Sequence, residues 1–200
     1  MHSLYNNLRN ESDSDFFLES WKKGLTGYPM VDACMRSLIK TGWLNFRMRA
    51  MLMSFASYHL WLPWQITSKY LASLFTDYEP GIHYAQSQMQ SGTTGINAIR
   101  IYNPIKQGID HDPDGIFIKK WLPELRKIPK TNIHKPWESI EYIKEYIPPI
   151  VDEIEARKLA ASKIYKLRKD KLHKIESKKI YLKHGSRKPS IKKISKQDKK

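Results

Sequence analysis

The chain has 200 residues, 40% of them hydrophobic and 12% aromatic, a composition that supports a buried core and excludes wholesale disorder. Its 35 Lys and Arg against 20 Asp and Glu give a net charge of +15, which favours a polyanionic partner or an acidic surface. The single cysteine, Cys34, excludes an intramolecular disulfide framework and fits a reducing compartment. The longest apolar stretch, residues 51–64, contains polar residues and is too short to cross a bilayer, so we expect a cytoplasmic protein with no membrane partner.

Apolar residues recur at helical spacing in four segments of the first 75 residues. Glycine and proline mark their ends, because glycine is favoured just after a helix and proline at its first position. The predicted helices cover residues 16–23, 29–41, 43–62 and 64–75, and Pro63 separates the last two.

Residues 78–114 contain seven glycines and prolines and few periodic apolar positions. This pattern predicts a long ordered loop, a kind of segment that is commonly functional in a compact protein. Helix resumes near Gly115, and no segment alternates apolar and polar residues as a strand does. The predicted fold class is all-α, with long ordered loops and a basic C-terminal extension.

The charge is unevenly distributed between two parts of the chain. Residues 1–150 carry a net charge of +3 and all six tryptophans, whereas residues 151–200 carry +12. This division predicts a globular region over 1–150 and a basic tail over 151–200. Within the tail, residues 152–170 are rich in good helix formers, and the scarcity of apolar residues beyond about Lys183 predicts disorder.

Two arginines, Arg47 and Arg49, lie among apolar residues of the helix predicted over 43–62. Their side chains diverge by about 200° on a helix, so they cannot serve one group together. They are either two surface arginines whose stems cover apolar surface, or one of them faces the interior and needs an acidic partner. The nearest candidates for that partner are Asp77 and Glu79.

No metal site is expected. Residues 110–115 begin like a calcium-binding loop, but Trp121 stands where that loop requires a bidentate glutamate. None of the seven histidines forms an HExxH motif or a Cys/His pair. The six tryptophans suit core packing, stacking on bases or electron relay, and composition alone leaves these alternatives open.

Several short motifs follow one another in order over about residues 15–155. They are WxxGxTGYPxVDAxMR at 21–36, TGWxxxRxR at 41–49, IYNPxxQG at 101–108, FIxxWLPEL at 117–125, PW at 136–137 and PIVD at 149–152. Together they resemble the C-terminal part of the FAD-binding helical domain of the DNA photolyase/cryptochrome family.

The resemblance implies an all-helical domain that holds FAD, and a deoxyribodipyrimidine photo-lyase, in which the reduced flavin uses light to pass an electron to a pyrimidine dimer in DNA. The positions that match the family's cofactor contacts are Trp43, Arg49, Asp77 and Glu79. The positions assigned to DNA contact are Arg47, Lys106 and Gln107. Trp64 matches the middle member of the tryptophan relay that photoreduces the flavin, and is the residue assigned to catalysis.

Three departures from the family pattern accompany these matches. Phe46 stands where photolyases usually carry an asparagine, and His59 stands where an aspartate pairs with the flavin-side arginine. Residues 82–89 replace an asparagine and two tryptophans, one of them the relay member nearest the flavin, so the ordinary relay is broken. Because the surrounding motifs are intact, the chain is similar to a divergent bacterial branch of photolyase-like proteins.

The resemblance also implies that a preceding part is missing. A whole family member begins with an α/β antenna domain and the first half of the helical domain, which grips the FAD diphosphate. The chain is therefore expected to be a truncated family member, an expressed fragment, or a split gene product whose missing half comes from a separate polypeptide. We expect it, when isolated, to bind FAD weakly or not at all and to be inactive.

A different class of function competes with this interpretation. The chain is then a non-catalytic photolyase/cryptochrome remnant or a photoreceptor fragment that acts as a basic nucleic-acid-binding module. Its tail would bind phosphates electrostatically and without chemistry.

Overall fold

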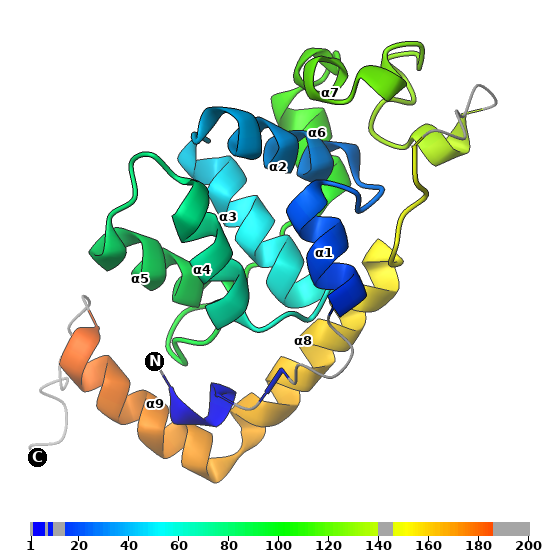
Figure 1. Ribbon diagram of the computed structural model, residues 1–200. Helices are drawn as coiled ribbons and strands as arrows, with labels where there is room; N and C mark the ends of the chain where they lie inside the picture. Colours follow the sequence, from blue (N-terminus) through cyan, green and yellow to red (C-terminus); the bar gives the residue numbers. More distant parts are fainter. Residues whose placement is uncertain (1, 7, 10–14, 140–145, 186–200) are drawn as a thin grey trace, which may run out of the picture.

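The computed structural model describes residues 2–6, 8–9, 15–139 and 146–185. Within these ranges the secondary structure is helical and contains no strand, so the predicted all-α class is confirmed (Figure 1). None of the described helices is long and apolar enough to span a membrane. The α-helices are α1 (Asp15–Lys23), α2 (Pro29–Thr41), α3 (Phe46–Ser54), α4 (Trp64–Leu74), α5 (Pro80–Gln90), α6 (Pro104–His111), α7 (Ile116–Trp121), α8 (Glu153–Lys169) and α9 (Lys171–His184). The shorter helical turns are η1 (Ser3–Tyr5), the π-helical η2 (Phe55–His59), η3 (Pro123–Leu125) and η4 (Pro136–Glu138).

The helix predicted over residues 43–62 is corrected at both ends. α3 begins only at Phe46, because the Asn45 side chain accepts a hydrogen bond from Met48 N (3.0 Å) and caps the helix there. At the other end the helix widens into η2, and the chain then passes Trp61, which has a positive φ of 54°. Two cations lie over the Trp61 ring, the Arg9 guanidinium at 4.7 Å and the Lys163 ammonium at 4.6 Å from its centre.

The prediction of a loop over residues 78–114 is wrong for two segments, which form the helices α5 and α6. Each helix has proline at its first position and a capping side chain just before it. Glu79 accepts a hydrogen bond from Ile82 N (2.7 Å), and Asn103 accepts one from Lys106 N (2.8 Å). Proline starts a helix at that position because its missing N–H is one that the first turn leaves unbonded anyway. The ordered loop between the two helices is residues 91–103.

α2 lies in the middle of the core and contacts α1, α3, α6 and α7 (Figure 1). Asp32 on this helix is buried, and its carboxylate accepts hydrogen bonds from Thr26 N (2.8 Å), Thr26 Oγ1 (2.6 Å), Gly27 N (3.0 Å) and Tyr146 Oη (2.7 Å). Burial raises the pKa of the Asp32 carboxyl, although these hydrogen bonds act in the opposite direction. The carboxylate thereby ties the turn before α2 and the distant Tyr146 to the centre of the fold.

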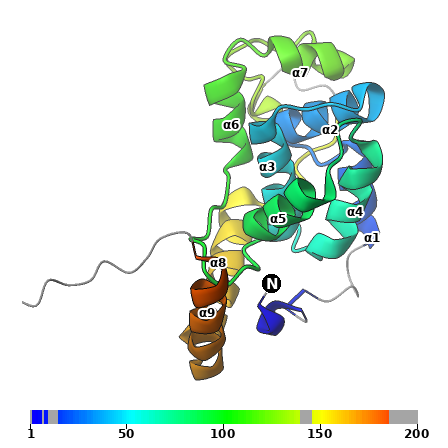
Figure 2. The ribbon, with the colours of Figure 1, turned by 90° about the vertical axis from the view of Figure 1, so that its left-hand side faces the viewer.

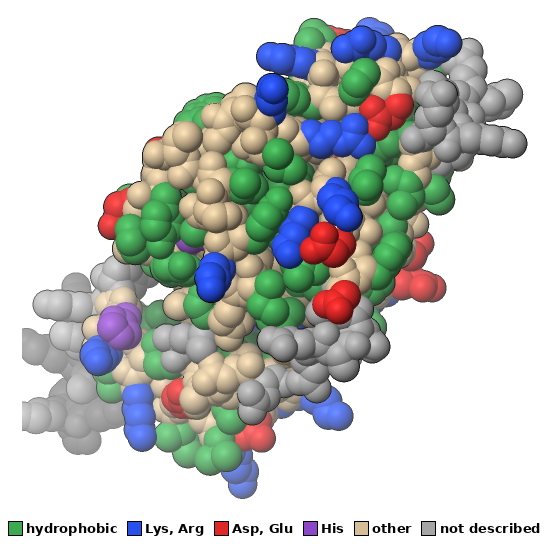
Figure 3. Space-filling view, viewed as in Figure 1, with side chains coloured by type: hydrophobic (Ala, Val, Ile, Leu, Met, Phe, Trp, Pro, Cys, Tyr) green, Lys and Arg blue, Asp and Glu red, His purple; other side chains and the backbone are tan. Residues whose placement is uncertain are grey.

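The helix predicted over residues 152–170 is confirmed as α8, which packs against η2. Together α8 and α9 form an arm along the lower edge of the molecule in Figure 1, and Figure 2 shows this arm projecting below the other helices. Lys and Arg side chains are spread over this edge (Figure 3). The disorder predicted beyond about Lys183 falls mainly on residues 186–200, which lie outside the described ranges. The boundary placed after residue 150 stays a prediction.

Candidate functional site

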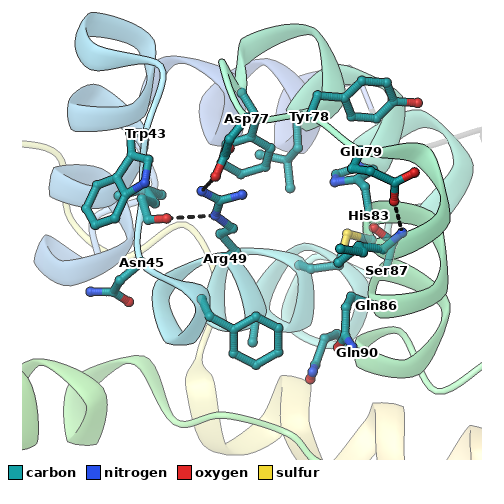
Figure 4. A pocket seen from close by; sticks show the side chains of 17 residues that line it. Trp43, Asn45, Arg49, Asp77, Tyr78, Glu79, His83, Gln86, Ser87 and Gln90 are labelled. Atoms are coloured by element: carbon teal, nitrogen blue, oxygen red, sulfur yellow. Dashed lines mark hydrogen bonds and ion pairs between the residues drawn. The ribbon is translucent and has the colours of Figure 1, made fainter.

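A cavity of about 420 Å³ lies between α3, α4 and α5, and is called here the central pocket (Figure 4). Its volume is in the range of small-molecule sites. Ala50, Met53 and Leu71 give it an apolar lining, while Trp43 and Phe46 also line it and are 55% and 59% exposed. Large apolar rings left this exposed around a cavity are typical of a binding surface.

Arg49 is held in a fixed orientation at one end of the central pocket. Its Nε donates a hydrogen bond to Leu44 O (2.7 Å), and its Nη2 donates to Asp77 Oδ2 (2.8 Å). The guanidinium carbon lies 4.1 Å from the centre of the Phe75 ring. The hydrogen bond from Arg49 lowers the pKa of the Asp77 carboxyl, so this group stays ionised and keeps the cation in place.

The two acidic candidates have different tasks. Figure 4 shows Asp77 facing Arg49, with Glu79 at the opposite, α5 side of the pocket. The Glu79 side chain caps the first turn of α5, so its carboxylate holds the helix that forms that wall. Of the alternatives left open by the sequence, Arg49 is the arginine that has an acidic partner, and Asp77 is that partner.

His83 is a pocket residue that sequence reasoning missed. Its Nε2 lies 2.8 Å from Ser68 O, and since a carbonyl only accepts, the proton sits on Nε2 and Nδ1 keeps a lone pair. Burial, with a smaller effect from the nearby Arg49 charge, lowers the pKa of His83, so its imidazole is neutral near pH 7. Gln86, Ser87 and Gln90 also line the pocket and were missed. All four residues lie on α5, where the sequence predicts a loop instead of a helix.

Arg47 points away from Arg49 and lines a neighbouring cavity of about 770 Å³, which we call the side pocket. Lys120 and Trp121 of α7 line it as well, and the two cavities share the segment 43–46. The side pocket thus places cations beside exposed aromatic rings, as a nucleic-acid contact requires. The assignment of Arg47 to DNA stays a prediction.

The other predicted site residues lie outside the central pocket. Trp64 is nearly buried at the start of α4, where its Nε1 has no hydrogen-bond partner among the described residues. On α6, the Lys106 ammonium pairs with Asp110 (2.9 Å), and Gln107 is only 8% exposed, which leaves little of it for contact with DNA. The roles given to these three residues stay predictions.

His59 does not replace the aspartate partner of the flavin-side arginine. Its ring is buried, stacks on Phe55 at 4.9 Å and lies 3.7 Å from Glu153 Oε1. Arg49 therefore takes its carboxylate from Asp77 instead. Among the described residues no group of three or more His, Cys, Asp or Glu side chains is arranged to hold a metal ion.

Comparison with known proteins assigns the chain to a family. The family model described as the FAD binding domain of DNA photolyase matches residues 1–166. The chain is 38% identical over 169 residues to Cryptochrome-2 of Arabidopsis thaliana. This alignment covers 79% of the chain and 28% of the relative. It is 36% identical over 169 residues to the deoxyribodipyrimidine photo-lyase of Alkalihalophilus pseudofirmus, which covers 79% of this chain and 35% of the relative.

Solved structures agree with these matches. An archaeal photolyase from Sulfolobus tokodaii, crystallised with two FAD molecules, superposes with a TM-score of 0.77 at 32% identity, covering 82% of this chain and 38% of that one. A bacterial class III photolyase from Agrobacterium tumefaciens gives a TM-score of 0.75 at 33% identity, covering 83% and 36%. The chain spans about a third of the length of its relatives. FAD, the predicted cofactor, is confirmed at the level of the family, and the chain belongs to the family of the FAD-binding domain of DNA photolyase.

Proposed function

We propose that the chain forms part of the FAD site of a photolyase-like flavoprotein, and that the central pocket receives the isoalloxazine ring. The apolar lining suits the body of a flat ring system, and a fixed cation suits its polar edge. Gln86 Oε1, which lines this pocket, is buried without a hydrogen-bond partner in the described part of the chain. A buried acceptor of this kind is available to a donor on a ligand.

The observation that carries the proposal is the orientation of Arg49. Two separate acceptors hold its guanidinium at the cavity, so the positive charge needs no reorganisation when a ligand arrives. A fixed cation beside a flavin ring favours the form of the ring that carries negative charge. Bound FAD supplies light absorption and electron transfer, while the chain supplies orientation and electrostatics.

A titration of the purified chain with FAD, followed by the quenching of flavin fluorescence, tests this proposal. We expect weak, saturable binding that falls by about tenfold or more in Arg49→Ala, because hydrogen bonds to a charged group are removed. Arg126→Ala, an exposed arginine that bonds to Lys119 O, is the matched control and should leave binding unchanged. Equal binding by the wild type and Arg49→Ala would contradict the proposal.

The same proposal assigns to the complete protein the light-driven splitting of pyrimidine dimers in DNA. It is supported by the relatives that are deoxyribodipyrimidine photo-lyases, and by the cations of the side pocket. Because the chain spans about a third of those relatives, we propose that protein outside residues 1–200 supplies the remainder of the site.

The chain purified from its own cells together with whatever polypeptide it binds tests this part. We expect the complex to carry flavin and to remove dimers from ultraviolet-irradiated DNA in blue light but not in darkness. A complex that carries stoichiometric flavin and leaves the dimers intact in light would contradict it.

A second candidate function is a basic nucleic-acid-binding module, which is favoured by the net charge of +12 on residues 151–200. Colourless protein would then bind undamaged DNA, with an affinity that falls by orders of magnitude between low and physiological salt. Fluorescence anisotropy with irradiated and undamaged duplexes separates the two functions. A preference for the irradiated duplex supports repair, and equal, salt-sensitive binding to both supports the module.

A further inference from the structure

The N-terminal strap, residues 2–6 and 8–9, joins the loop that follows α5 to helix α9 (Figure 1). The backbone N–H of His2 donates to Thr93 O in that loop (3.2 Å). The next residue, Ser3, donates from its N–H and its hydroxyl to the two carboxylate oxygens of Glu176 on α9, at 2.8 and 2.6 Å. One short segment therefore ties together parts of the chain that are more than 80 residues apart.

A second anchor of the strap is Arg9. Its guanidinium is buried and donates to Ser57 O in η2 and to Ser91 O just after α5, both at 2.9 Å. Arginine stays protonated at any ordinary pH, so this anchor does not respond to acid.

Besides the Ser3–Glu176 hydrogen bonds, the strap and α9 are joined by a series of hydrogen bonds that passes through His173. Arg168 Nε lies 3.2 Å from Tyr5 Oη, and Tyr5 Oη lies 3.0 Å from His173 Nε2. On the other side of the ring, His173 Nδ1 lies 3.3 Å from Ser177 Oγ, which donates to Gly95 O (3.0 Å). This series of hydrogen bonds runs from α8 through the strap and α9 to the loop after α5.

The direction of every hydrogen bond in this series follows from the groups at its two ends, Arg168 and the carbonyl of Gly95. An arginine only donates, so Tyr5 Oη accepts from Arg168 and gives its own proton to His173 Nε2. A carbonyl only accepts, so the Ser177 hydroxyl donates to Gly95 O and accepts from His173 Nδ1. The arrangement is complete only when His173 is neutral and carries its single proton on Nδ1.

Addition of a second proton to His173, at Nε2, is unfavourable in the folded chain. The proton would point at Tyr5 Oη, whose hydrogen already points at the ring. The His2 ring lies parallel to that of His173, with centroids 4.3 Å apart and planes inclined by 20°, and its Nε2 is 3.1 Å from His173 O. His173 itself is only 4% exposed, so water cannot solvate the added charge.

The charges around His173 come from each element packed on it. Arg168 from α8 and His2 from the strap oppose a positive charge, whereas Glu176 and Asp170 favour one. Residues 93–97 of the loop carry no titratable side chain. Burial acts most strongly, and the net result is that the pKa of His173 is lowered from its ordinary value of 6.5.

We propose that His173 is an acid-sensitive latch, and that uptake of a second proton by its imidazole releases the strap and the loop after α5 from α9. The loop continues directly from α5, the helix that carries His83, Gln86 and Gln90 into the central pocket. Opening the latch therefore loosens that wall of the pocket. This inference needs no bound flavin and does not depend on the proposed function.

The sign of the pH dependence follows from the lowered pKa. Free histidine gains its proton more readily than His173 in the folded chain, so acid favours the open state. The latch contributes its full stability above about pH 6.5 and loses it as the pH falls through the folded-state pKa.

Hydrogen–deuterium exchange of the full chain at about pH 7.5 and about pH 5.5, corrected for intrinsic exchange rates, tests the latch across the range in which histidine titrates. We expect protection of the strap and of residues 91–97 to fall at the lower pH by up to about tenfold, the limit set by the ordinary histidine pKa of about 6.5. In His173→Gln, whose amide accepts and donates but never titrates, the two pH values should give equal protection. His184→Gln, an exposed histidine on the same helix, should behave as the wild type.

Equal protection of the wild type at both pH values would overturn the proposal, and so would a His173→Gln variant with the same loss as the wild type. Should His173→Gln fail to fold, ¹⁵N NMR of histidine-labelled wild type gives an independent answer. We expect His173 to carry its proton on Nδ1 and to titrate below the ordinary histidine pKa of 6.5. A proton on Nε2, or titration at or above that ordinary value, would contradict the latch.

Discussion

Two carboxylates in this molecule show how differently one chemical group serves in two regions. Asp32 in the core receives four hydrogen bonds from neutral donors and is fully buried, whereas Asp77 at the rim of the central pocket is paired with one arginine and half exposed. Burial raises the pKa of the first, and the hydrogen bond from Arg49 lowers the pKa of the second. In the core, the Asp32 carboxylate holds separate segments of the backbone together. At the rim, the Asp77 carboxylate orients the Arg49 guanidinium at the central pocket.

This contrast separates stability from binding. Removal of the core carboxylate leaves several buried donors without an acceptor, which is expensive because water cannot reach them. Removal of the rim carboxylate leaves an arginine that water can still solvate, so the fold is almost unaffected. The effect at the rim should appear instead in the affinity for a ligand.

The largest effect is expected for Asp32→Ala. The Thr26 amide, the Thr26 hydroxyl and the Gly27 amide lose their acceptor, at roughly 1–3 kcal/mol for each unsatisfied buried group, so the free energy of unfolding should fall by about 4 kcal/mol. Urea denaturation followed by tryptophan fluorescence measures it. Asp114→Ala removes an exposed carboxylate and is the control, with an expected change within about 0.5 kcal/mol. A loss below about 1 kcal/mol for Asp32→Ala would refute the anchoring role.

An intermediate effect, on binding instead of stability, is expected for Asp77→Asn. The free energy of unfolding should change by less than about 0.5 kcal/mol, because exposed ion pairs contribute little. Affinity for FAD in the fluorescence titration should fall by about fivefold, because the neutral amide that replaces the carboxylate holds the Arg49 guanidinium less strongly. Asp110→Asn breaks another exposed ion pair, with Lys106, and should alter neither quantity. The comparison fails if Asp77→Asn destabilises the fold as strongly as Asp32→Ala.

The smallest effect is expected for Gln86→Leu. Its buried, unpartnered Oε1 disappears, so the free energy of unfolding should stay equal or rise slightly. One hydrogen bond to the ligand is lost, which should weaken FAD binding by about two- to fivefold. Gln65→Leu on the exposed side of α4 is the control for the added apolar surface. Unchanged affinity in Gln86→Leu would show that this acceptor does not meet the ligand.

The sequence predicted the helices whose ends carry local signals. α1, α2 and α4 lie within two residues of the predicted segments, because glycine and proline act at a helix end through the backbone alone. The sequence does not predict α5 and α6, although Pro80 and Pro104 occupy the same first position and a capping side chain precedes each, because few apolar residues in these segments recur at helical spacing. With α5 missed, the pocket residues His83 and Gln86 could not be found.

The candidate site was predicted in part. Arg49, Asp77 and Glu79 follow from the motif and from the need of a partly buried arginine for an acidic partner, and they lie around one cavity. The choice of Asp77 over Glu79 depends on which of them the connection between α4 and α5 turns toward α3, and the sequence carries no signal for that choice.

The order and composition of the residues are enough to establish the helical class, the charge of the tail and the side chains available for chemistry, because these depend on local preferences. Which groups meet is set by the tertiary fold. It paired Arg49 with Asp77, buried Asp32 beneath Tyr146, and placed His2 against His173 across 171 positions of the chain. Such contacts depend on how helices pack, and packing is a property of the whole chain that no local pattern specifies.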